Sequence, residues 1–247
     1  MSKLGTVIVT GGSRGIGAAI CRLVSRRGYA VAVNYATKPD AAERVAAAIR
    51  EDGGRAVPIA CDVADPRQVY TLFETAQQSL GPIVGLVNNA GTTGVTARTD
   101  MQEPEDLQRL FAINVFGTMY CAREAVRRMS TGHGGGGGAI VNISSAAARL
   151  GGLSGLAPYA ASKGAVESFT RGLANEVALE GIRVNAVAPG MTATEMATEE
   201  MRASVKNGGI PMARIGEAEE IAEAALWLLS PAASYVTGVV LTVSGGR

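Results

Sequence analysis

The sequence predicts an α/β domain built on a doubly wound parallel sheet of about seven strands, with helices on both faces. Short apolar runs alternate with alanine-rich helical stretches along all 247 residues. Successive runs begin roughly 25–55 residues apart, the spacing of repeated strand–helix–strand units with right-handed crossovers. No shift in composition marks a second domain, so residues 1–247 are predicted to form one unit.

Seven segments are predicted as strands because each is short and nearly all apolar. Strands buried on both faces of a parallel sheet have this pattern, whereas half-exposed strands alternate. The segments are residues 6–10, 30–34, 56–60, 84–88, 139–143, 183–187 and 239–243.

The helices between these strands have recognisable ends. Asp40 and Glu43 have capping-box spacing, and Asp65 precedes a proline suited to a first helical position. Several glycines follow helical stretches, where a residue of positive φ commonly ends a helix. These are Gly28, Gly53, Gly54, Gly81 and Gly181, and the predicted helices include residues 18–26, 104–129 and 160–179.

A glycine-rich run at residues 132–138 precedes the fifth strand. Consecutive glycines lose much entropy when fixed, so this run is expected to be a mobile surface loop without a catalytic part. His133 within it is expected to be solvated.

Composition excludes several classes of protein. The 23 Lys and Arg residues nearly balance 22 Asp and Glu residues, which argues against a nucleic-acid partner. A hydrophobic content of 47% argues against disorder, and no segment is long enough and apolar enough to predict a membrane span. Three scattered cysteines and a single histidine offer no metal site, and with no signal-peptide pattern they predict a cytoplasmic protein.

A glycine-rich turn follows the first strand directly. Its residues are Thr10-Gly11-Gly12-Ser13-Arg14-Gly15-Ile16-Gly17, and a helix follows. Glycines in this place allow the backbone to approach a pyrophosphate, and the helix N-terminus offers free N–H groups. The turn therefore predicts dinucleotide binding and a Rossmann-type fold, with a purely structural turn as the alternative.

The end of the second strand favours NADP over NAD. An NAD site usually has an acidic residue there for the ribose 2′-hydroxyl. This chain has Asn34, with no acidic residue until Asp40, and Arg14 in the turn suits a 2′-phosphate. Arg14 as an ordinary surface cation is the alternative.

A second group of polar residues predicts the chemistry. Tyr159 and Lys163 are four residues apart, on one face of a helix. Ser145 follows the fifth strand, at the sheet edge where ligands bind in such folds. A tyrosine pKa of about 10 is too high for proton exchange near neutrality, so Lys163 and an oxidised nicotinamide are expected to lower it. Ser145 can donate a hydrogen bond to a carbonyl oxygen.

In chain order, the glycine turn, Asn88-Asn89-Ala90-Gly91, Asn114, Ser145, Tyr159 with Lys163, and Pro189-Gly190 resemble the short-chain dehydrogenases/reductases over residues 3–246. The resemblance implies that Lys163 also binds the nicotinamide ribose and that Asn114 holds a water in a proton relay. The remaining implied cofactor contacts are Asp62 and Val63 at the adenine, Asn89 near the adenosine ribose, Ala90 and Gly91 beside it, Pro189 and Gly190 in a shaping turn, and Thr192 at the carboxamide.

Two neighbouring serines, Ser144 and Ser145, are candidates for the serine that donates a hydrogen bond to the carbonyl oxygen. The family usually places this serine thirteen residues before the tyrosine, which would be Ala146 here. Ser145 is chosen because it ends the Asn-Ile-Ser-Ser strand, with the extra residue placed in the loop of residues 150–157.

The expected function is NADP(H)-dependent interconversion of a carbonyl and a secondary alcohol on a small-molecule substrate. The pattern resembles 3-oxoacyl-carrier-protein reductases and sugar or polyol dehydrogenases. Arg127 and Arg128 are candidates for docking an acidic carrier protein, although Glu180 is acidic. A protein that senses NADP without catalysis and a structural subunit are two further hypotheses, and both conflict with an intact Ser-Tyr-Lys set.

Two further expectations come from the resemblance. A homotetramer is expected first and a dimer second. Residues 191–210 are expected to form a lid over the substrate.

Overall fold

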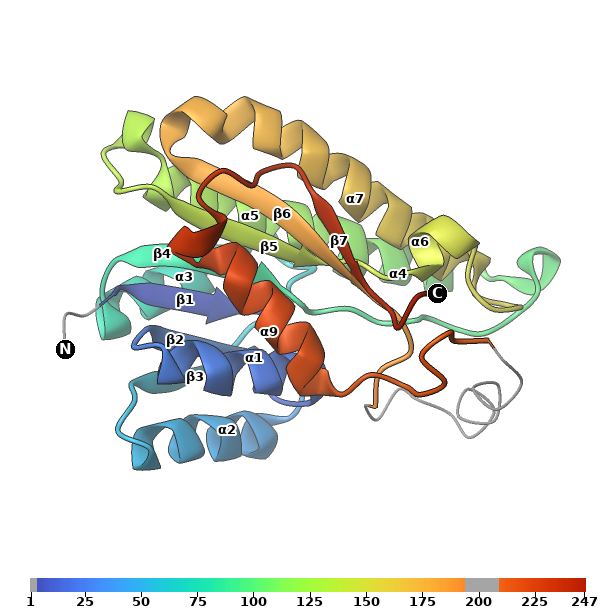
Figure 1. Cartoon of the computed structure of the whole chain (residues 1–247), viewed down its shortest axis with the longest axis horizontal. Coiled ribbons are helices and arrows are strands. Elements are labelled where there is room, and N and C mark those ends of the chain that lie inside the picture. Colours follow the sequence, from blue (N-terminus) through green and yellow to red (C-terminus); the bar gives the residue numbers. More distant parts are fainter. Residues whose placement is uncertain (1–3, 194–208) are drawn as a thin grey trace.

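The computed structural model describes residues 4–193 and 209–247, and these contain one sheet of seven parallel strands (Figure 1). The strand order is β3-β2-β1-β4-β5-β6-β7, with every neighbouring pair parallel. The strands are β1 (Thr6–Val9), β2 (Ala30–Tyr35), β3 (Ala56–Ala60), β4 (Ile83–Asn88), β5 (Gly138–Ile143), β6 (Ile182–Pro189) and β7 (Val240–Val243). The predicted fold class and all seven strands are confirmed, with ends shifted by a few residues.

Side chains that alternate along the strands divide the interior into two apolar cores. In β1, Val7 and Val9 point into one core while Ile8 points into the other, and all three are buried. This alternation follows from the two-residue period of a strand. Both faces of the sheet therefore exclude water, as the apolar runs predict.

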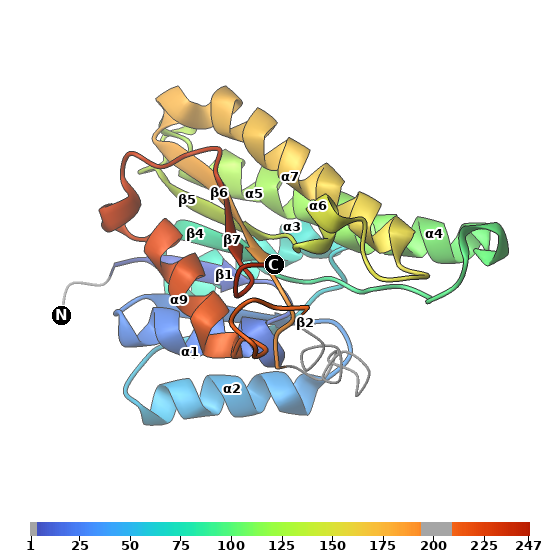
Figure 2. The same ribbon diagram turned by 45° about the vertical axis from the view of Figure 1, so that its right-hand side comes forward.

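Helices cover each face of the sheet in a separate layer (Figures 1 and 2). One layer is α1 (Gly15–Arg26), α2 (Pro39–Glu51) and α9 (Ala218–Leu229). The other is α3 (Pro66–Leu80), α5 (Gly117–Met129) and α7 (Ala157–Val177). The shorter α4 (Pro104–Phe111) and α6 (Ala147–Leu150) lie towards the carboxyl ends of the strands.

The helix predicted over 104–129 is continuous but not uniform. Between α4 and α5 the backbone forms a π-helical turn, Ala112–Phe116. Such turns are rare and frequent at functional sites. Here the turn holds Asn114, which is fully buried.

The predicted helix ends are partly right. Asp65 accepts a hydrogen bond from the Arg67 N–H and caps α3, as predicted. The capping box at Asp40 is wrong: α2 begins at Pro39 with Lys38 as its N-cap, two residues earlier than the box implies, and Glu43 pairs with Arg50. A proline at a first helical position fixes φ and outweighs the spacing signal.

Four of the five predicted helix-ending glycines have positive φ. They are Gly28, Gly53, Gly81 and Gly181, whereas Gly54 does not.

The glycine run is a hydrogen-bonded turn, which differs from the expected loop without fixed structure. The Gly135 N–H donates to the Ser130 carbonyl at 2.8 Å, and the Gly137 N–H donates to the Met129 carbonyl at 2.7 Å. A Cβ at Gly135 would lie 2.5 Å from backbone atoms of residues 128 and 129. Glycine is needed at this position because the loop folds back onto the backbone at the end of α5 too closely for a side chain. His133 is exposed, as predicted.

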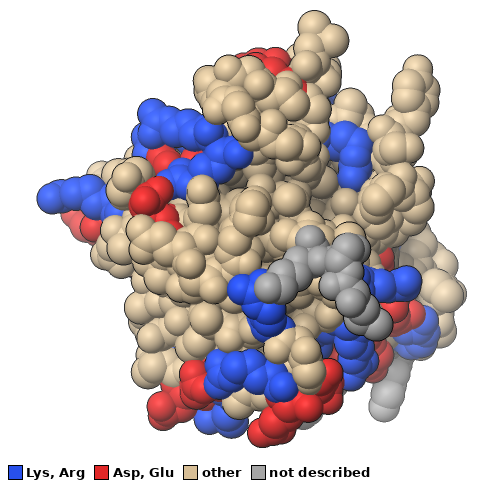
Figure 3. All heavy atoms as spheres, turned by 90° about the vertical axis from the view of Figure 1, so that its left-hand side faces the viewer, with Lys and Arg blue, Asp and Glu red and all other residues tan. Residues whose placement is uncertain are grey.

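Surface charge is mixed on the face opposite the carboxyl ends of the strands. Figure 3 shows basic and acidic side chains side by side there, in keeping with a net charge of +1. Across residues 4–193 and 209–247, no helix is long and apolar enough to cross a membrane.

The predicted lid lies mostly outside the described residues. Of residues 191–210, the structure describes only 191–193 and 209–210.

Candidate active site

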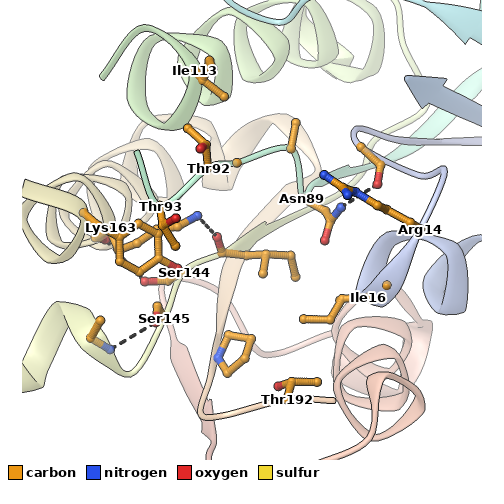
Figure 4. Close-up of a pocket in the computed structure, with 18 of the residues that line it drawn as sticks. Arg14, Ile16, Asn89, Thr92, Thr93, Ile113, Ser144, Ser145, Lys163 and Thr192 are labelled. Atoms are coloured by element: carbon orange, nitrogen blue, oxygen red, sulfur yellow. Dashed lines mark hydrogen bonds between the residues drawn. The ribbon is translucent and has the colours of Figure 1, made fainter. Parts of the chain in front are cut away.

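A cavity of about 550 Å³ lies at the carboxyl ends of the strands and collects nearly all the predicted site residues (Figure 4). The strand order reverses between β1 and β4: β2 and β3 lie beyond β1, and β5, β6 and β7 lie beyond β4. The connections diverge at this point and leave a crevice at the carboxyl ends of the two strands, where ligands bind in doubly wound sheets. The predicted residues that line it are Gly11, Ser13, Arg14, Gly15, Ile16, Asn34, Asp62, Val63, Asn89, Ala90, Gly91, Ser145, Tyr159, Lys163, Pro189, Gly190 and Thr192. Gly17 and Asn114 do not line the cavity themselves, but each lies next to residues that do.

The glycine turn is held by close backbone contacts that only glycine permits. Gly11 has φ +61°, and its N–H donates to Asn34 Oδ1 at 3.1 Å. A Cβ on Gly17 would lie 2.3 Å from the Gly11 carbonyl oxygen and 2.5 Å from Asn89 Nδ2. The start of α1 is thereby drawn against the turn, with Arg14 as its N-cap residue. A helix N-terminus presented in this way suits a pyrophosphate.

Asn89 braces the turn as well as lining the cavity. Its Nδ2 donates to the carbonyls of Thr10 (2.9 Å) and Gly11 (3.0 Å). The Thr10 hydroxyl in turn accepts from the N–H groups of Asn89 and Ala90. The first and fourth strands therefore hold the turn jointly.

Asn34 has a different role from the one predicted. It touches the cavity, but its side chain is buried and hydrogen-bonded to the protein. Its Oδ1 accepts from Gly11, and its Nδ2 donates to the carbonyls of Ile59 and Cys61. Asn34 ties β2 to β3 and to the turn. The cavity wall at the end of β2 comes instead from residues that the site prediction left out: Tyr35, Ala36, Thr37 and Lys38.

Asp62 and Val63 follow β3, at the same end of the cavity as the turn. Asp62 accepts from the Ala64 N–H and pairs with Arg109 at 2.7 Å. Val63 is buried and lies within 2.7 Å of where a Gly117 Cβ would be. Arg109 also lines the cavity, and no local motif pointed to it.

Ser145 and Lys163 lie at the opposite end of the cavity from Arg14 (Figure 4), and Tyr159 lines the cavity beside them. The Ser145 hydroxyl is hydrogen-bonded to the Tyr159 hydroxyl. Lys163 is buried, its Nζ lies 5.9 Å from the centre of the Tyr159 ring, and it donates to the Ile143 carbonyl at 2.8 Å. The end of β5 and the first turns of α7 thus place three polar groups together.

Ser144 points away from this group. Its hydroxyl donates to Glu167 Oε1 at 2.9 Å, and the Lys163 carbonyl lies 3.3 Å away. Of the two serines, it is Ser145, the one chosen from the sequence, that is hydrogen-bonded to the tyrosine hydroxyl.

Asn114 is committed to protein partners. Its Oδ1 accepts from the Thr92 N–H at 2.9 Å, and its Nδ2 donates to the Thr92 carbonyl and the Ser162 hydroxyl. Its own carbonyl accepts from the Thr118 hydroxyl at 2.9 Å. Asn114 therefore links the π-helical turn to α7 and to the loop after β4.

The turn after β6 brings the last predicted contact into place. The Thr192 hydroxyl donates to the Gly190 carbonyl at 3.2 Å, and Thr192 is buried. A Cβ on Gly190 would lie 2.7 Å from Ser244 Cα. The residues after β7 therefore press against this turn.

Burial is the largest cause of the pKa shifts of Tyr159 and Lys163. It raises the pKa of Tyr159, and the hydrogen bond from Ser145 lowers that pKa by less. It lowers the pKa of Lys163 to about 8. Only burial and Ser145 shift the pKa of Tyr159 in this structure, where the Lys163 ammonium donates to the Ile143 carbonyl. The expected lowering by Lys163 together with an oxidised nicotinamide stays a prediction.

The lowered pKa of Lys163 predicts a pH-dependent stability. Below pH 8 the lysine is charged in both the folded and unfolded states, and its desolvation cost is complete. Between pH 8 and about 10.5 it loses its proton only when folded, so the free energy of unfolding rises with pH. Relative to Lys163→Met, the wild type should gain about 2 kcal/mol between pH 7 and 10 in urea unfolding. A difference between the two proteins that stays constant with pH would contradict the assignment.

The residues at this site fit a nicotinamide dinucleotide. Gly11 and Gly17 leave room that a Cβ would fill, the N-terminus of α1 faces the same place, and the cavity continues to Tyr159. The fold and the cavity define a dinucleotide-binding oxidoreductase of the α/β class.

Comparison with known proteins gives the family. A family model described as enoyl-(acyl carrier protein) reductase matches residues 11–247. The chain is 46% identical over 243 residues to the uncharacterized oxidoreductase YgfF of Escherichia coli, covering 97% of this chain and 98% of that one. It is 38% identical to glucose 1-dehydrogenase 2 of Bacillus subtilis, covering 98% and 93%. A solved short-chain dehydrogenase from Burkholderia cenocepacia in complex with NADP superposes with a TM-score of 0.90, at 32% identity, covering 97% and 96%. The chain belongs to the short-chain dehydrogenase/reductase superfamily and is an oxidoreductase acting on CH–OH groups.

Proposed function

We propose that this oxidoreductase uses NADP(H) to interconvert a small-molecule ketone and its secondary alcohol, with Tyr159 as the proton donor and acceptor. The observation that carries the proposal is the arrangement of one cavity. The glycine turn lies at one end, and the hydrogen-bonded Ser145 and Tyr159 lie at the other with the buried Lys163.

Each of the chain's polar groups has a distinct part in the reduction. When bound, the nicotinamide supplies the hydride to the carbonyl carbon. The Tyr159 hydroxyl gives its proton to the carbonyl oxygen, and Ser145 donates a hydrogen bond to that oxygen as negative charge develops. Lys163 binds the nicotinamide ribose and favours the resulting phenolate, together with the positive charge of the oxidised ring.

Asn114 fixes the backbone around the path by which Tyr159 regains its proton after the reduction. We assign it a positioning role, because it links the loop after β4 to α7 beside Lys163. A water held at this turn would return the proton to Tyr159.

NADP is favoured over NAD by the residues at the end of β2. Arg14, Thr37 and Lys38 line the cavity there, and no described residue of β2 or of the segment after it brings a carboxylate to the cavity wall. A cationic edge without an acidic residue suits a 2′-phosphate and not a free 2′-hydroxyl. The Burkholderia relative in complex with NADP supports the same choice.

A small substrate is favoured over one carried on an acidic protein. Arg127 and Arg128, the candidate docking residues, both pair with the buried Glu124, and Arg128 also pairs with Glu74. Arg123 pairs with Glu124 as well, so three arginines share two carboxylates and much of their charge is compensated within the chain. Reduction of 3-oxoacyl groups on a carrier protein is the second possibility, and a non-catalytic NADP sensor is the third.

We place the protein in the cytoplasm as a homotetramer, ahead of a dimer. Cys21, Cys61 and Cys121 are free and buried, in keeping with a reducing compartment. Exposed apolar side chains such as Phe116 and Trp227 lie on helices that offer faces for self-association.

An absorbance assay at 340 nm tests the function. NADPH and NADH are each combined with ketones, β-ketoesters, diketones, quinones and acyl thioesters, including a thioester on a carrier protein. Turnover with NADPH on a free ketone is expected. Preference for NADH would contradict the cofactor assignment, turnover only on the carrier protein would favour the second function, and tight NADPH binding without turnover would favour the sensor.

The two neighbouring serines provide a matched pair of variants. Ser145→Ala should lower kcat by about 10²- to 10³-fold, because it removes a donor to the developing oxyanion. Ser144→Ala should lower kcat only a few-fold, because its hydroxyl contacts Glu167 and not Tyr159. Steady-state rates with NADPH, and melting curves to check folding, would measure both. A larger loss for Ser144→Ala would reverse the assignment.

A further inference from the structure

A second, smaller hollow of about 240 Å³ lies between α1 and α2. Ser13, Arg14 and Gly15 line both this hollow and the main cavity. The two spaces therefore adjoin at the glycine turn, on the side where β2 ends.

Small side chains on the two helices create the hollow. Ala18 follows Arg14 by four residues on α1, and Ala41 precedes Val45 by four on α2. Residues four apart share a helix face. Because both pairs line the same hollow, these two faces are turned towards each other. Arg22, one turn beyond Ala18, and Arg44 complete the lining, and both are exposed.

Positive charge gathers around this hollow. Three of the eight lining residues are arginines, and none is acidic. Within residues 4–193 and 209–247, Arg22 and Arg44 form no ion pair, and the nearby Glu43 pairs with Arg50. Asp40, beside Ala41, lines neither space. The charges of Arg22 and Arg44 line one hollow without a carboxylate among its lining residues, and a bound anion lowers the repulsion between them.

The lining selects a phosphate among anions. Guanidinium groups match phosphate oxygens with paired N–H donors, and the Ser13 hydroxyl and the start of α1 add further donors. A dinucleotide held by the glycine turn brings its adenosine ribose to the end of β2, beside Arg14 and Lys38.

We propose that Arg22 and Arg44 extend the 2′-phosphate site of NADP, so that three arginines, Arg14 of the glycine turn, Arg22 of α1 and Arg44 of α2, bind this phosphate. The inference rests on the proposed function for the identity of the dinucleotide. The preference for NADP over NAD would then depend partly on α2, and not only on the glycine turn and the end of β2.

Equilibrium binding tests the proposal without turnover. Calorimetric titrations compare adenosine 2′,5′-bisphosphate with ADP on the wild type, Arg22→Gln, Arg44→Gln and the double variant. Each single change should weaken bisphosphate binding about three- to fivefold, and the double change about tenfold or more, while ADP binding stays within twofold. The loss should shrink at high salt. Arg26→Gln, an exposed arginine of α1 that lines neither space, is the control and should change neither ligand.

Three outcomes would overturn the proposal. Unchanged bisphosphate binding would show that the arginines do not reach the 2′-phosphate. Equal losses of affinity for the bisphosphate and for ADP would show that the arginines attract any anionic nucleotide through their overall charge and do not contact the 2′-phosphate. Inorganic phosphate that raises the melting temperature through Arg22 and Arg44, with bisphosphate affinity intact, would identify a free-phosphate site. Because neither nucleotide carries a nicotinamide, failure of the proposed reaction would appear only in the turnover assay.

Discussion

Replacement of Tyr159 by phenylalanine is expected to lower kcat by about 10³-fold, within the 10²- to 10⁴-fold range of general acid–base catalysis, and to leave NADPH affinity within about twofold. The phenol is the group that gives a proton to the carbonyl oxygen, whereas the ring itself and the remainder of the cavity are retained. kcat and kcat/KM should fall together, because the lost interaction is made only in the transition state. Steady-state assays and a fluorescence titration with NADPH would measure the two quantities separately.

Tyr120→Phe is a matched control for this experiment. Tyr120 lies on α5, stacks on Phe116 and does not line the cavity, so the same loss of a hydroxyl should leave kcat unchanged. If Tyr159→Phe kept more than about a tenth of the wild-type kcat, another group would have to deliver the proton.

Gly17→Ala is expected either to weaken NADPH binding by about 10²-fold or to lower the melting temperature of the protein. The new Cβ would lie 2.3 Å from the Gly11 carbonyl oxygen and 2.5 Å from Asn89 Nδ2. The carbonyl is backbone, so the turn must move away from α1, and overpacking of this kind costs about 3 kcal/mol. That cost corresponds to a loss of about 10²-fold in affinity if it falls on the bound state, or to a lower melting temperature if it falls on the fold.

Gly172→Ala separates this steric effect from the general effect of a methyl group in a helix. Gly172 lies within α7, and nothing surrounds its Cβ position within 4 Å. Alanine there should raise the free energy of unfolding by about 0.5–1 kcal/mol and leave NADPH binding unchanged. Wild-type affinity and melting temperature in Gly17→Ala would show that the turn tolerates the side chain.

The fold and the position of the site could be predicted because they depend on local pattern. Short runs that are mostly apolar identified all seven strands, since a strand covered on both faces has no polar side to display. A glycine turn between a first strand and a first helix has few structural uses, so it located the cavity. The order of crossovers then brings Ser145 and Tyr159 to the same sheet edge.

Side-chain partners could not be predicted, because pattern gives a residue's face but not its contacts. Asn34 sits at the right strand end, yet its hydrogen bonds to β3 and the turn occupy it. Arg22 and Arg44 resemble ordinary surface cations until two helices place them on one hollow. The raised pKa of Tyr159 depends on burial, which no four-residue spacing encodes. The ordered glycine run likewise depends on how closely this loop folds back onto the end of α5.

Transfer of a labelled hydride tests the central claim most directly. NADPH carrying deuterium at both hydrogens of nicotinamide C4 would be incubated with the enzyme and the best ketone of the substrate panel, and the product examined by mass spectrometry and NMR. The account predicts one deuterium on the carbinol carbon for each NADPH consumed, and about 10³-fold slower labelling with Tyr159→Phe. An unlabelled product, or labelling that proceeds equally fast without the tyrosine hydroxyl, would contradict it.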